Sequence, residues 1–318
     1  MKQYIDLLRE VLDKGEAQPD NRTGIPTIAL PYGSMMRFDM NDGFPLETGR
    51  AMPWKGIKGE LIGFLRGCTS AAEFRELGCE FWNQNANENQ AWLANPLRKG
   101  EDDLGRIYGK QWREWVGALE YVDDSAAPAE QRSTFRATFD GVEYGVLSKP
   151  MDQVMNAIHA VRKDPGNRAI IINAWKPDEF HQMALRPCHV LYQFRVNQAR
   201  NELSLEMYQR SGDMFLGVPC NIASASLLLH IVARITGRKA RHFTHFIADA
   251  HIYENHMDQA RELVERGDRA LPDLVFSDRI VPFDGSVFRP GYINMIGPDD
   301  INIAGYHPHP AIKAPMAV

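Results

Sequence analysis

The chain has 318 residues, of which 44% are hydrophobic and 24% are charged, enough apolar material for one large core or two smaller ones. Its formal net charge of −5 excludes the chain-wide basic field that nonspecific nucleic-acid binding needs. Any anion site must therefore be a local cluster of cations, which fits a small phosphorylated substrate better than a polymer.

The amino-terminal half alternates between helical and strand-like patterns. Apolar residues at helical spacing predict a surface helix over residues 2–14, which Gly15 ends. Residues 26–40 alternate as strands do, and residues 57–65 return to helical spacing with Glu60 among them. Residues 116–148 are acidic and then strand-like, and they contain no motif.

The carboxyl-terminal half predicts a mixed α/β arrangement. We expect helices over 151–161 and 222–235, and strands over 170–175, 189–196, 203–209 and 241–250. Residues 272–298 are typical of a loop with an edge strand. No internal repeat or low-complexity linker interrupts these elements, which indicates one domain over residues 1–318 with a variable outer lobe.

Cysteine usage and hydropathy predict where the chain works. Its four cysteines have neither the paired spacing of a metal site nor the density of a disulfide framework, so we expect a reducing cytoplasm and no metal. No apolar run approaches the ~20 residues that a membrane span requires, and the first residues open directly into an amphipathic pattern. We therefore predict neither export nor a membrane anchor.

The richest stretch runs over residues 185–224, and it centres on Cys188. An unpaired cysteine is often a small buried hydrophobe, but Pro187 before it favours a position at the mouth of a strand. Antiparallel pairing of the two strands through a turn at 197–201 would carry Arg210 and Ser211 back beside this thiol. A neighbouring arginine favours the thiolate, which is the reactive form of cysteine.

Motifs along the whole chain resemble those of the thymidylate synthases. They occur in order from end to end and cover most of the sequence apart from apparent insertions at 90–102 and 116–148. The matching segments are Asp20-Asn21-Arg22-Thr23-Gly24, Gly59-Glu60-Leu61, Tyr108-Gly109-Lys110-Gln111-Trp112, the stretch 185–224, Asp249 to His256 and the tail Pro308 to Pro315. The resemblance implies the family's α/β (α+β) fold, a large mixed β-sheet flanked by helices, with one sheet face used for homodimerisation.

The resemblance also assigns roles to individual residues. It implies dUMP as substrate, 5,10-methylenetetrahydrofolate as co-substrate, and no nucleic-acid or membrane partner. Residues with an implied catalytic role are Cys188, Glu60, Tyr108, Asn221 and Asp213. Those implied to bind the nucleotide are Arg22, Arg168, Arg210, Ser211, Asn221, His251 and Tyr253, with Arg168 reaching the phosphate held by the neighbouring subunit. Those implied to contact the folate are Asp213, Trp82, Gly217 and Ala317.

The chemistry of uracil fits these residue types. A thiolate that adds at C6 of the ring makes C5 nucleophilic, and Cys188 is the candidate for that attack. A carboxamide offers N3–H an acceptor and O4 a donor on one planar group, so Asn221 suits uracil where a carboxylate would suit cytosine. These features favour dUMP over dCMP.

Several positions depart from the family pattern around the folate. Asn85, Cys220 and Ala225 replace a tryptophan, a phenylalanine and a tyrosine, Ala51-Met52-Pro53 replaces a basic stretch, and Ala169 replaces a second arginine. Lost ring area would loosen the folate and admit water. We therefore predict that water captures the exocyclic methylene to give 5-hydroxymethyl-dUMP, as in bacteriophage relatives. The alternative is a thymidylate synthase, in which hydride from the folate reduces the methylene and gives dTMP.

A third interpretation is a nucleotide-binding protein that has lost turnover and acts as a regulatory or structural subunit. Retention of Cys188 together with Glu60 and Tyr108 argues against it, since a pure binder has no need of the thiol.

Overall fold

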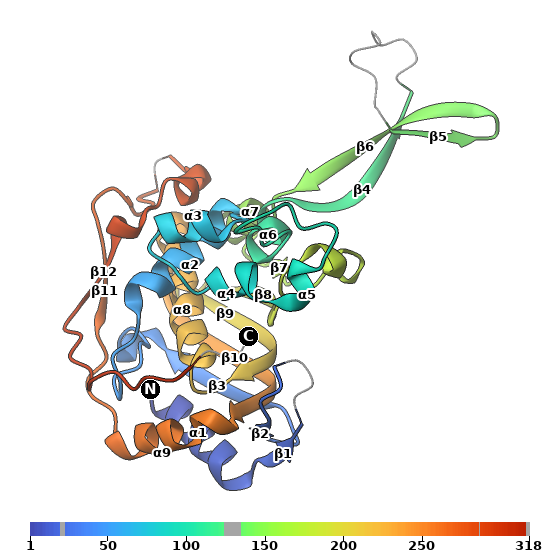
Figure 1. Ribbon diagram of the computed structural model, residues 1–318. Helices are drawn as coiled ribbons and strands as arrows, with labels where there is room; N and C mark the ends of the chain where they lie inside the picture. Colours follow the sequence, from blue (N-terminus) through green and yellow to red (C-terminus); the bar gives the residue numbers. More distant parts are fainter. Residues whose placement is uncertain (20–22, 124–134, 286, 316–318) are drawn as a thin grey trace.

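The computed structural model describes residues 1–19, 23–123, 135–285 and 287–315. Within these residues the main sheet has seven strands in the order β1-β2-β10-β9-β8-β7, and β3 pairs with β10 beside this path (Figure 1). Its strands are β1 (Glu16–Gln18), β2 (Thr27–Ala29), β3 (Ser34–Asp39), β7 (Ile171–Asn173), β8 (His189–Asn197), β9 (Glu202–Asp213) and β10 (Lys239–Tyr253). The sheet is mixed and lies against helices, as the fold class predicted.

The centre of the sheet carries the predicted hairpin. β8 and β9 pair antiparallel from Asn197↔Glu202 to His189↔Gln209, and Asn201 takes the left-handed conformation (φ 54°) that closes the turn. β9 and β10 pair in parallel, so a crossover must join them. That crossover is α8 (Gly217–Thr236).

Helix α8 is the core helix of the molecule. It is apolar on nearly all sides, and residues such as Ile222, Leu228 and Ile231 are fully buried. By length and composition it matches a membrane span, with a mean hydropathy of 1.5, so the expectation that no apolar run reaches that length was wrong. Since 78% of that apolar window is buried inside the protein, the helix fits the role of a core element.

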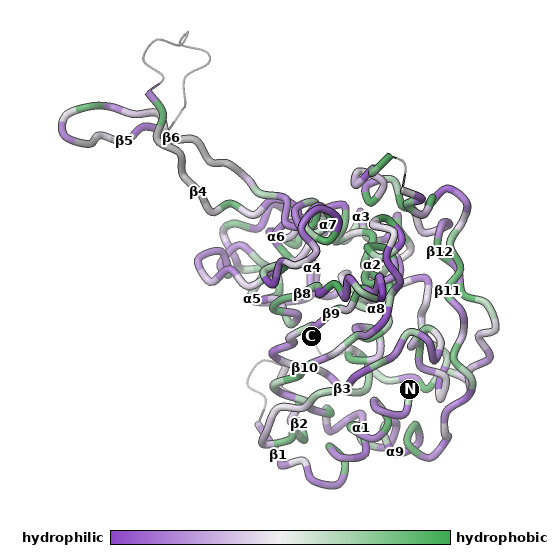
Figure 2. Tube along the Cα trace, turned by 180° about the vertical axis from the view of Figure 1, so that it is seen from behind, coloured by the Kyte–Doolittle hydropathy of each residue, from purple (hydrophilic) through white to green (hydrophobic). Residues whose placement is uncertain are grey.

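The remaining helices pack around this core. They are α1 (Lys2–Lys14), α2 (Trp54–Arg66), α3 (Ala71–Glu76), α4 (Asn83–Asn87), α5 (Gln90–Leu93), α6 (Tyr108–Arg113), α7 (Gln153–Lys163) and α9 (Met257–Arg266). Helices of the outer layer carry both hydrophilic and hydrophobic residues, as amphipathic surface helices do (Figure 2). The predicted helices at 2–14 and 57–65 are confirmed, the second with a longer start.

Several predicted boundaries shift. The helix expected from residue 151 begins at Gln153, because Met151 still pairs as the last residue of a strand and the Asp152 side chain caps the helix by accepting from Met155 N at 2.9 Å. The strand predicted over 170–175 contains only the three residues of β7. The edge strand expected within 272–298 is β11 (Asp273–Phe276), which pairs with β12 (Ile301–Ala304).

The stretch predicted as a second insertion forms an arm. β4 (Trp115–Val122), β5 (Phe135–Phe139) and β6 (Val142–Met151) make a three-stranded antiparallel sheet in the order β4-β6-β5. In Figure 1 this arm extends away from the body that carries the main sheet. The other predicted insertion, 90–102, begins with α5 on the body of the protein. The single-domain organisation over 1–318 stays a prediction.

Candidate active site

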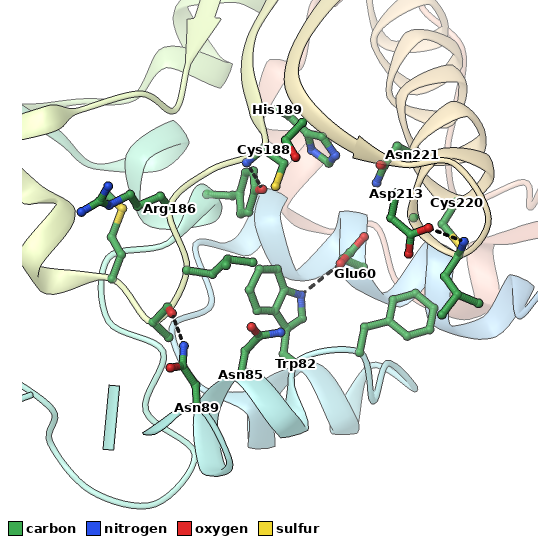
Figure 3. Close-up of a pocket in the computed structure, with 18 of the residues that line it drawn as sticks. Glu60, Trp82, Asn85, Asn89, Arg186, Cys188, His189, Asp213, Cys220 and Asn221 are labelled. Atoms are coloured by element: carbon green, nitrogen blue, oxygen red, sulfur yellow. Dashed lines mark hydrogen bonds between the residues drawn. The ribbon is translucent and has the colours of Figure 1, made fainter. Parts of the chain in front are cut away.

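One cavity of about 1220 Å³ opens beside the ends of β9, β10 and α8. It brings together eleven of the residues that the sequence singled out, although they come from distant segments. These are Glu60, Trp82, Tyr108, Cys188, Arg210, Ser211, Asp213, Gly217, Asn221, His251 and Tyr253. Figure 3 shows how the side chains of Cys188, Glu60, Trp82, Asp213 and Asn221 face a common space.

Cys188 lies directly before β8, at the mouth of the strand as predicted. The hairpin returns Arg210 beside it: Arg210 N donates to Cys188 O at 2.9 Å, and the guanidinium lies 3.7 Å from the sulfur. Two further guanidinium bonds reach the carbonyls of Pro187 and Arg186, at 2.9 and 3.0 Å. Arg210 therefore holds the loop that carries the thiol and also places a positive charge next to it.

Tyr108 begins α6 and contacts the same loop from the other side. Its hydroxyl accepts a hydrogen bond from Cys188 N at 2.5 Å, so the phenol fixes the backbone of the nucleophile. Its ring packs against Phe64 and His189, with centroids 4.9 and 5.2 Å away. Burial raises the pKa of Tyr108 well above its ordinary value, which keeps the hydroxyl protonated and able to donate.

Glu60 is a buried carboxyl group on the inner face of α2. Trp82 Nε1 donates to Glu60 Oε1 at 3.1 Å (Figure 3). Burial raises the pKa of Glu60 to about 7, and the bond from Trp82 opposes part of that shift. A carboxyl group that titrates near neutrality can both give and take a proton during turnover.

Asn221 projects from the first turns of α8 among neutral polar groups. Gln209 Nε2 donates to its Oδ1 at 3.1 Å. His189 lies beside the same side chain, and burial lowers the pKa of His189 to about 4, so its imidazole is neutral. Asn221 thus sits where a planar, uncharged ring edge can be recognised.

Ser211 and His251 both contact one carboxylate, Asp249, and the Tyr253 ring packs edge-on against His251 with centroids 5.3 Å apart. Ser211 Oγ donates to Asp249 Oδ2 at 3.1 Å, and His251 Nδ1 lies 3.2 Å from the same oxygen. Burial disfavours the charged imidazolium and by itself would lower the pKa of His251. The Asp249 carboxylate favours the charged form more strongly, so the pKa of His251 is raised. His251 and Tyr253 are the last residues of β10 on one face, whereas the sequence placed them after the strand.

Asp213 and Gly217 form the wall where β9 passes into α8. Asp213 Oδ1 accepts from the backbone N of Phe215 and of Leu216, at 3.0 and 3.2 Å. Cys220 lies in this wall beside Asp213, whereas Asn85 lines the cavity next to Trp82; both are side chains that replace family aromatics (Figure 3). An apolar wall with one carboxylate suits a flat heterocycle that carries N–H groups.

Two of the predicted residues fall outside the described part of the chain, and a third does not line the cavity of its own chain. Arg22 and Ala317 lie outside the described residues, as does Met316 onwards in the predicted tail. Arg168 is exposed and does not line the cavity of its own chain; it precedes β7, where Gln193 Nε2 donates to its carbonyl at 2.8 Å. Its predicted role toward a neighbouring subunit is consistent with this position.

Sequence reasoning missed several residues of the site. His189 and Gln209 are sequence neighbours of Cys188 and Arg210, which was the available signal. Arg50 also lines the cavity and lies 4.7 Å from the Phe215 ring centroid, but nothing in its local sequence indicated this. Gln90, Trp92 and Asn95, within the predicted insertion 90–102, add a further wall. Hydrogen bonds from Asn89 and Asn95 to the carbonyls of Ala184 and His181, both 2.9 Å, attach that wall to the loop before Cys188.

Comparison with known proteins decides the family. The family model described as thymidylate synthase matches residues 2–318. The chain belongs to the thymidylate synthase family. It is 46% identical to the thymidylate synthases of Pseudomonas syringae pv. tomato and Pseudomonas putida over 326 and 325 residues, covering 100% of each chain. It is 39% identical to thymidylate synthase 1/2 of Encephalitozoon cuniculi over 99% of this chain and 96% of that protein.

Membership in the thymidylate synthase family confirms several predictions. The chain is a one-carbon transferase, and enzymes of this family use methylenetetrahydrofolate as co-substrate and need no metal. The family acts on dUMP and is generally dimeric. None of the three relatives named above is called a hydroxymethylase, so these names favour the alternative product, dTMP.

Proposed function

We propose that this chain is a thymidylate synthase, which methylates dUMP to dTMP with methylenetetrahydrofolate and releases dihydrofolate. The observation that carries the proposal is the placement of the Cys188 sulfur 3.7 Å from the Arg210 guanidinium in a cavity that also contains Asn221 and Glu60. A nucleophile, a cation, a ring-recognising amide and a proton carrier are the groups that this reaction needs.

The nucleotide would lie across the β9 end of the cavity. Arg210 and Ser211 would hold the 5′-phosphate, together with Arg22 and with Arg168 of the partner subunit. His251 and Tyr253 would meet the sugar hydroxyl, and Asn221 would accept from N3–H and donate to O4. Each charge-assisted bond to the phosphate contributes roughly 1.5–3 kcal/mol, enough to position the ring for attack.

The covalent step begins with Cys188. Its sulfur forms a bond to C6 of uracil, and the electron pair of the C5–C6 double bond moves toward C5 and O4, where Asn221 stabilises the charge. C5 then bonds the one-carbon unit and later loses its proton, for which Tyr108 and Glu60 are the candidate groups. The bond between this carbon and the folate nitrogen then breaks, which leaves an exocyclic methylene on C5 and tetrahydrofolate beside it. Hydride from the tetrahydrofolate converts the methylene to methyl and yields dihydrofolate. Elimination of Cys188 restores the C5–C6 double bond and frees the enzyme.

Trp82, Asp213 and Gly217 would receive the folate, with Ala317 from the tail. Trp82 is buried and its ring stands across the cavity from Asp213 (Figure 3). The free oxygen of the Asp213 carboxylate is available to a pterin N–H, since Oδ1 is already bonded to the backbone. A stacked pterin keeps water from the methylene and so favours reduction.

A second candidate product is 5-hydroxymethyl-dUMP. Asn85 and Cys220 line the cavity where the family pattern has large rings, and the space they leave could admit water to the methylene. The experiment that separates the two is incubation of the protein with dUMP and methylenetetrahydrofolate. Formation of dTMP and dihydrofolate supports our proposal, whereas hydroxymethyl nucleotide and tetrahydrofolate would overturn it.

The inactive-binder interpretation is tested through the thiol. With 5-fluoro-dUMP and methylenetetrahydrofolate, mass spectrometry of the wild-type protein should show an adduct on Cys188 that Cys188→Ala lacks. Binding of dUMP without adduct or turnover in the wild type would support a binder. One-carbon transfer by Cys188→Ala would contradict the covalent mechanism.

The proposal includes a homodimer in the cytoplasm. All four cysteines are free, as a reducing compartment allows. One face of the main sheet exposes large apolar side chains from three strands, which supports a partner subunit on that face.

A further inference from the structure

Beneath Asn221, the glutamine Gln209 makes three hydrogen bonds and is 2% exposed. Its Nε2 lies 2.9 Å from Ser211 O and 3.1 Å from Asn221 Oδ1, and its Oε1 lies 2.8 Å from His245 Nε2. A backbone carbonyl can only accept, so the Ser211 carbonyl requires the NH₂ group of Gln209 on its side. That requirement fixes which end of each neighbouring group faces Gln209.

The orientation of Asn221 follows from this fixed point. The second hydrogen of the Gln209 NH₂ group points to Asn221, so Asn221 must present its oxygen inward. The Oε1 of Gln209 then faces His245 and needs a donor there, so His245 must carry its proton on Nε2. Each partner of Gln209 is therefore assigned one hydrogen-bonding role.

His245 is placed for this role by the sheet. It lies on β10, its ring is 0% exposed, and its strand neighbours are Met36 on β3 and Met207 on β9. Its Nδ1 is buried and has no hydrogen-bond partner among the described residues, which fits a neutral ring with the proton on Nε2. Burial lowers the pKa of His245 well below its ordinary value, and the nearby His189 acts in the same direction.

We propose that His245 is a positioning residue that, through Gln209, locks the carboxamide of Asn221 in the orientation that selects uracil over cytosine. The inference deepens the proposed function, because it rests on dUMP as the substrate of this cavity. In the locked orientation Asn221 Oδ1 is the acceptor for N3–H of uracil and Nδ2 is the donor to O4. A flipped amide would offer the opposite pattern, a donor to N3 and an acceptor for the amino group, which is what cytosine needs.

The discrimination depends on how costly the flip is. If the Asn221 amide flipped alone, its NH₂ group would face the NH₂ group of Gln209, and two donors would meet. If the amides of Asn221 and Gln209 flipped together, the NH₂ group of Gln209 would instead face the Nε2–H of His245. His245 therefore opposes the concerted flip, and the Ser211 carbonyl opposes it from the other end. If the His245 N–H is removed, only the Ser211 carbonyl still opposes the flip of Gln209, and the buried Gln209 Oε1 loses its donor.

The first test compares nucleotide binding by matched variants. Calorimetric titration gives the dissociation constants for dUMP and dCMP in the wild type, His245→Phe and His245→Gln. In His245→Phe the preference for dUMP over dCMP should fall about tenfold, the equivalent of one lost hydrogen bond. In His245→Gln the amide N–H replaces the imidazole N–H, and the preference should return.

His230→Phe is the matched control. His230 lies on α8 against Phe44, and its buried Nε2 has no hydrogen-bond partner in the part of the chain that the structure describes, so it takes no part in the relay. Its loss should leave the dUMP/dCMP preference unchanged. An unchanged preference in His245→Phe, or equal weakening of both nucleotides there, would show a merely structural histidine and overturn the inference.

A second measurement reads the wild-type protein itself and needs a variant only to assign the signals. Nitrogen-15 spectra of histidine-labelled wild-type protein report the tautomer of each ring, and the His245 signals are identified by their absence in His245→Gln. We expect the Nε2–H tautomer throughout neutral pH. A proton on Nδ1, or a charged ring, would overturn the relay even if dUMP binds. Failure of wild-type protein to bind dUMP with the tautomer as expected would instead count against the proposed function.

Discussion

At the scale of single residues, burial in the cavity shifts the pKa values of the side chains that line it. Glu60 and His189 both line the cavity, and desolvation moves their pKa values in opposite directions, Glu60 up to about 7 and His189 down to about 4. Both shifts favour the neutral form. The site thus holds one carboxyl group that titrates near physiological pH beside an imidazole that does not titrate there.

Glu60→Gln should lower turnover by about 10²–10⁴-fold, because the amide cannot carry a proton between water and the ring. The wild-type rate should show an inflection near pH 7 that disappears in this variant. Trp82→Phe is the companion change: Trp82 Nε1–H lowers the pKa of Glu60, so losing it should move the inflection to higher pH. A pH–rate profile with the same inflection in Glu60→Gln would exclude Glu60 as its source.

The same carboxyl group should make stability depend on pH. Its pKa rises from 4.5 unfolded to about 7 folded, so its contribution is present below about pH 4.5 and is lost as pH rises through 7. Relative to Glu60→Gln, the wild-type free energy of unfolding should fall by about 3 kcal/mol over that interval. Urea unfolding at both ends of the range measures this difference, and a constant difference would contradict the buried, raised carboxyl.

At the scale of elements, a buried ion network joins α6 to the loop before Cys188. Glu179 accepts from Arg106 Nε at 2.5 Å and from Gln111 Nε2 at 2.7 Å, and it pairs with Lys176 Nζ at 3.1 Å. Burial by itself would raise the pKa of Glu179, but the hydrogen bonds and charges of these donors have the larger combined effect and lower it. The network therefore fixes the two elements that bring Tyr108 to the backbone of Cys188.

Glu179→Ala should destabilise the fold by about 3–5 kcal/mol, since it removes the buried carboxylate that Lys176 and the largely buried Arg106 share, and leaves these cations only the more exposed carboxylates of Asp178 and Glu114. Asp178→Ala is the matched control: Asp178 pairs with the same Lys176 at 2.6 Å, but its side chain is 72% exposed. Its loss should cost about 0–1 kcal/mol. Denaturant midpoints compare the two variants, and equal effects would show that the network does not brace these elements.

At the scale of the whole molecule, the outer face of the main sheet favours a partner subunit. Met35, Phe246 and Tyr208 are direct cross-strand neighbours on β3, β10 and β9, and they are 52%, 40% and 42% exposed. A row of large apolar side chains across a sheet centre is typical of an interface. We therefore expect Phe246→Asp to yield monomers in sedimentation, with full dimerisation of that variant contradicting this face.

Subunit mixing tests whether Arg168 acts in trans. Subunits with Cys188→Ser lack the nucleophile, and subunits with Arg168→Ala lack the phosphate contact. In a mixed dimer, one cavity would have Cys188 of one chain and Arg168 of the other. Mixing should therefore raise activity above that of either variant alone, whereas no gain would indicate that Arg168 serves its own chain.

The sequence by itself determined the local elements and the nucleophile. Pro187 before Cys188, two β-patterned runs and a turn were enough to predict the hairpin that returns Arg210 and Ser211, because strand pairing and turn chemistry are written in short-range patterns. The family resemblance then identified most of the predicted residues that line the cavity. It did not settle the product, for which the relatives' names favoured methylation over the hydroxymethylation we expected.

Only the tertiary structure decided the properties that depend on surroundings. Nothing near Glu60 in the chain shows that Trp82 would be its partner or that its pKa would lie near 7. The row from His245 through Gln209 to Asn221 joins two strands and a helix, so no spacing along the chain reveals it. Desolvation and hydrogen-bond direction are set by residues distant in sequence, and those contacts exist only once the chain has folded.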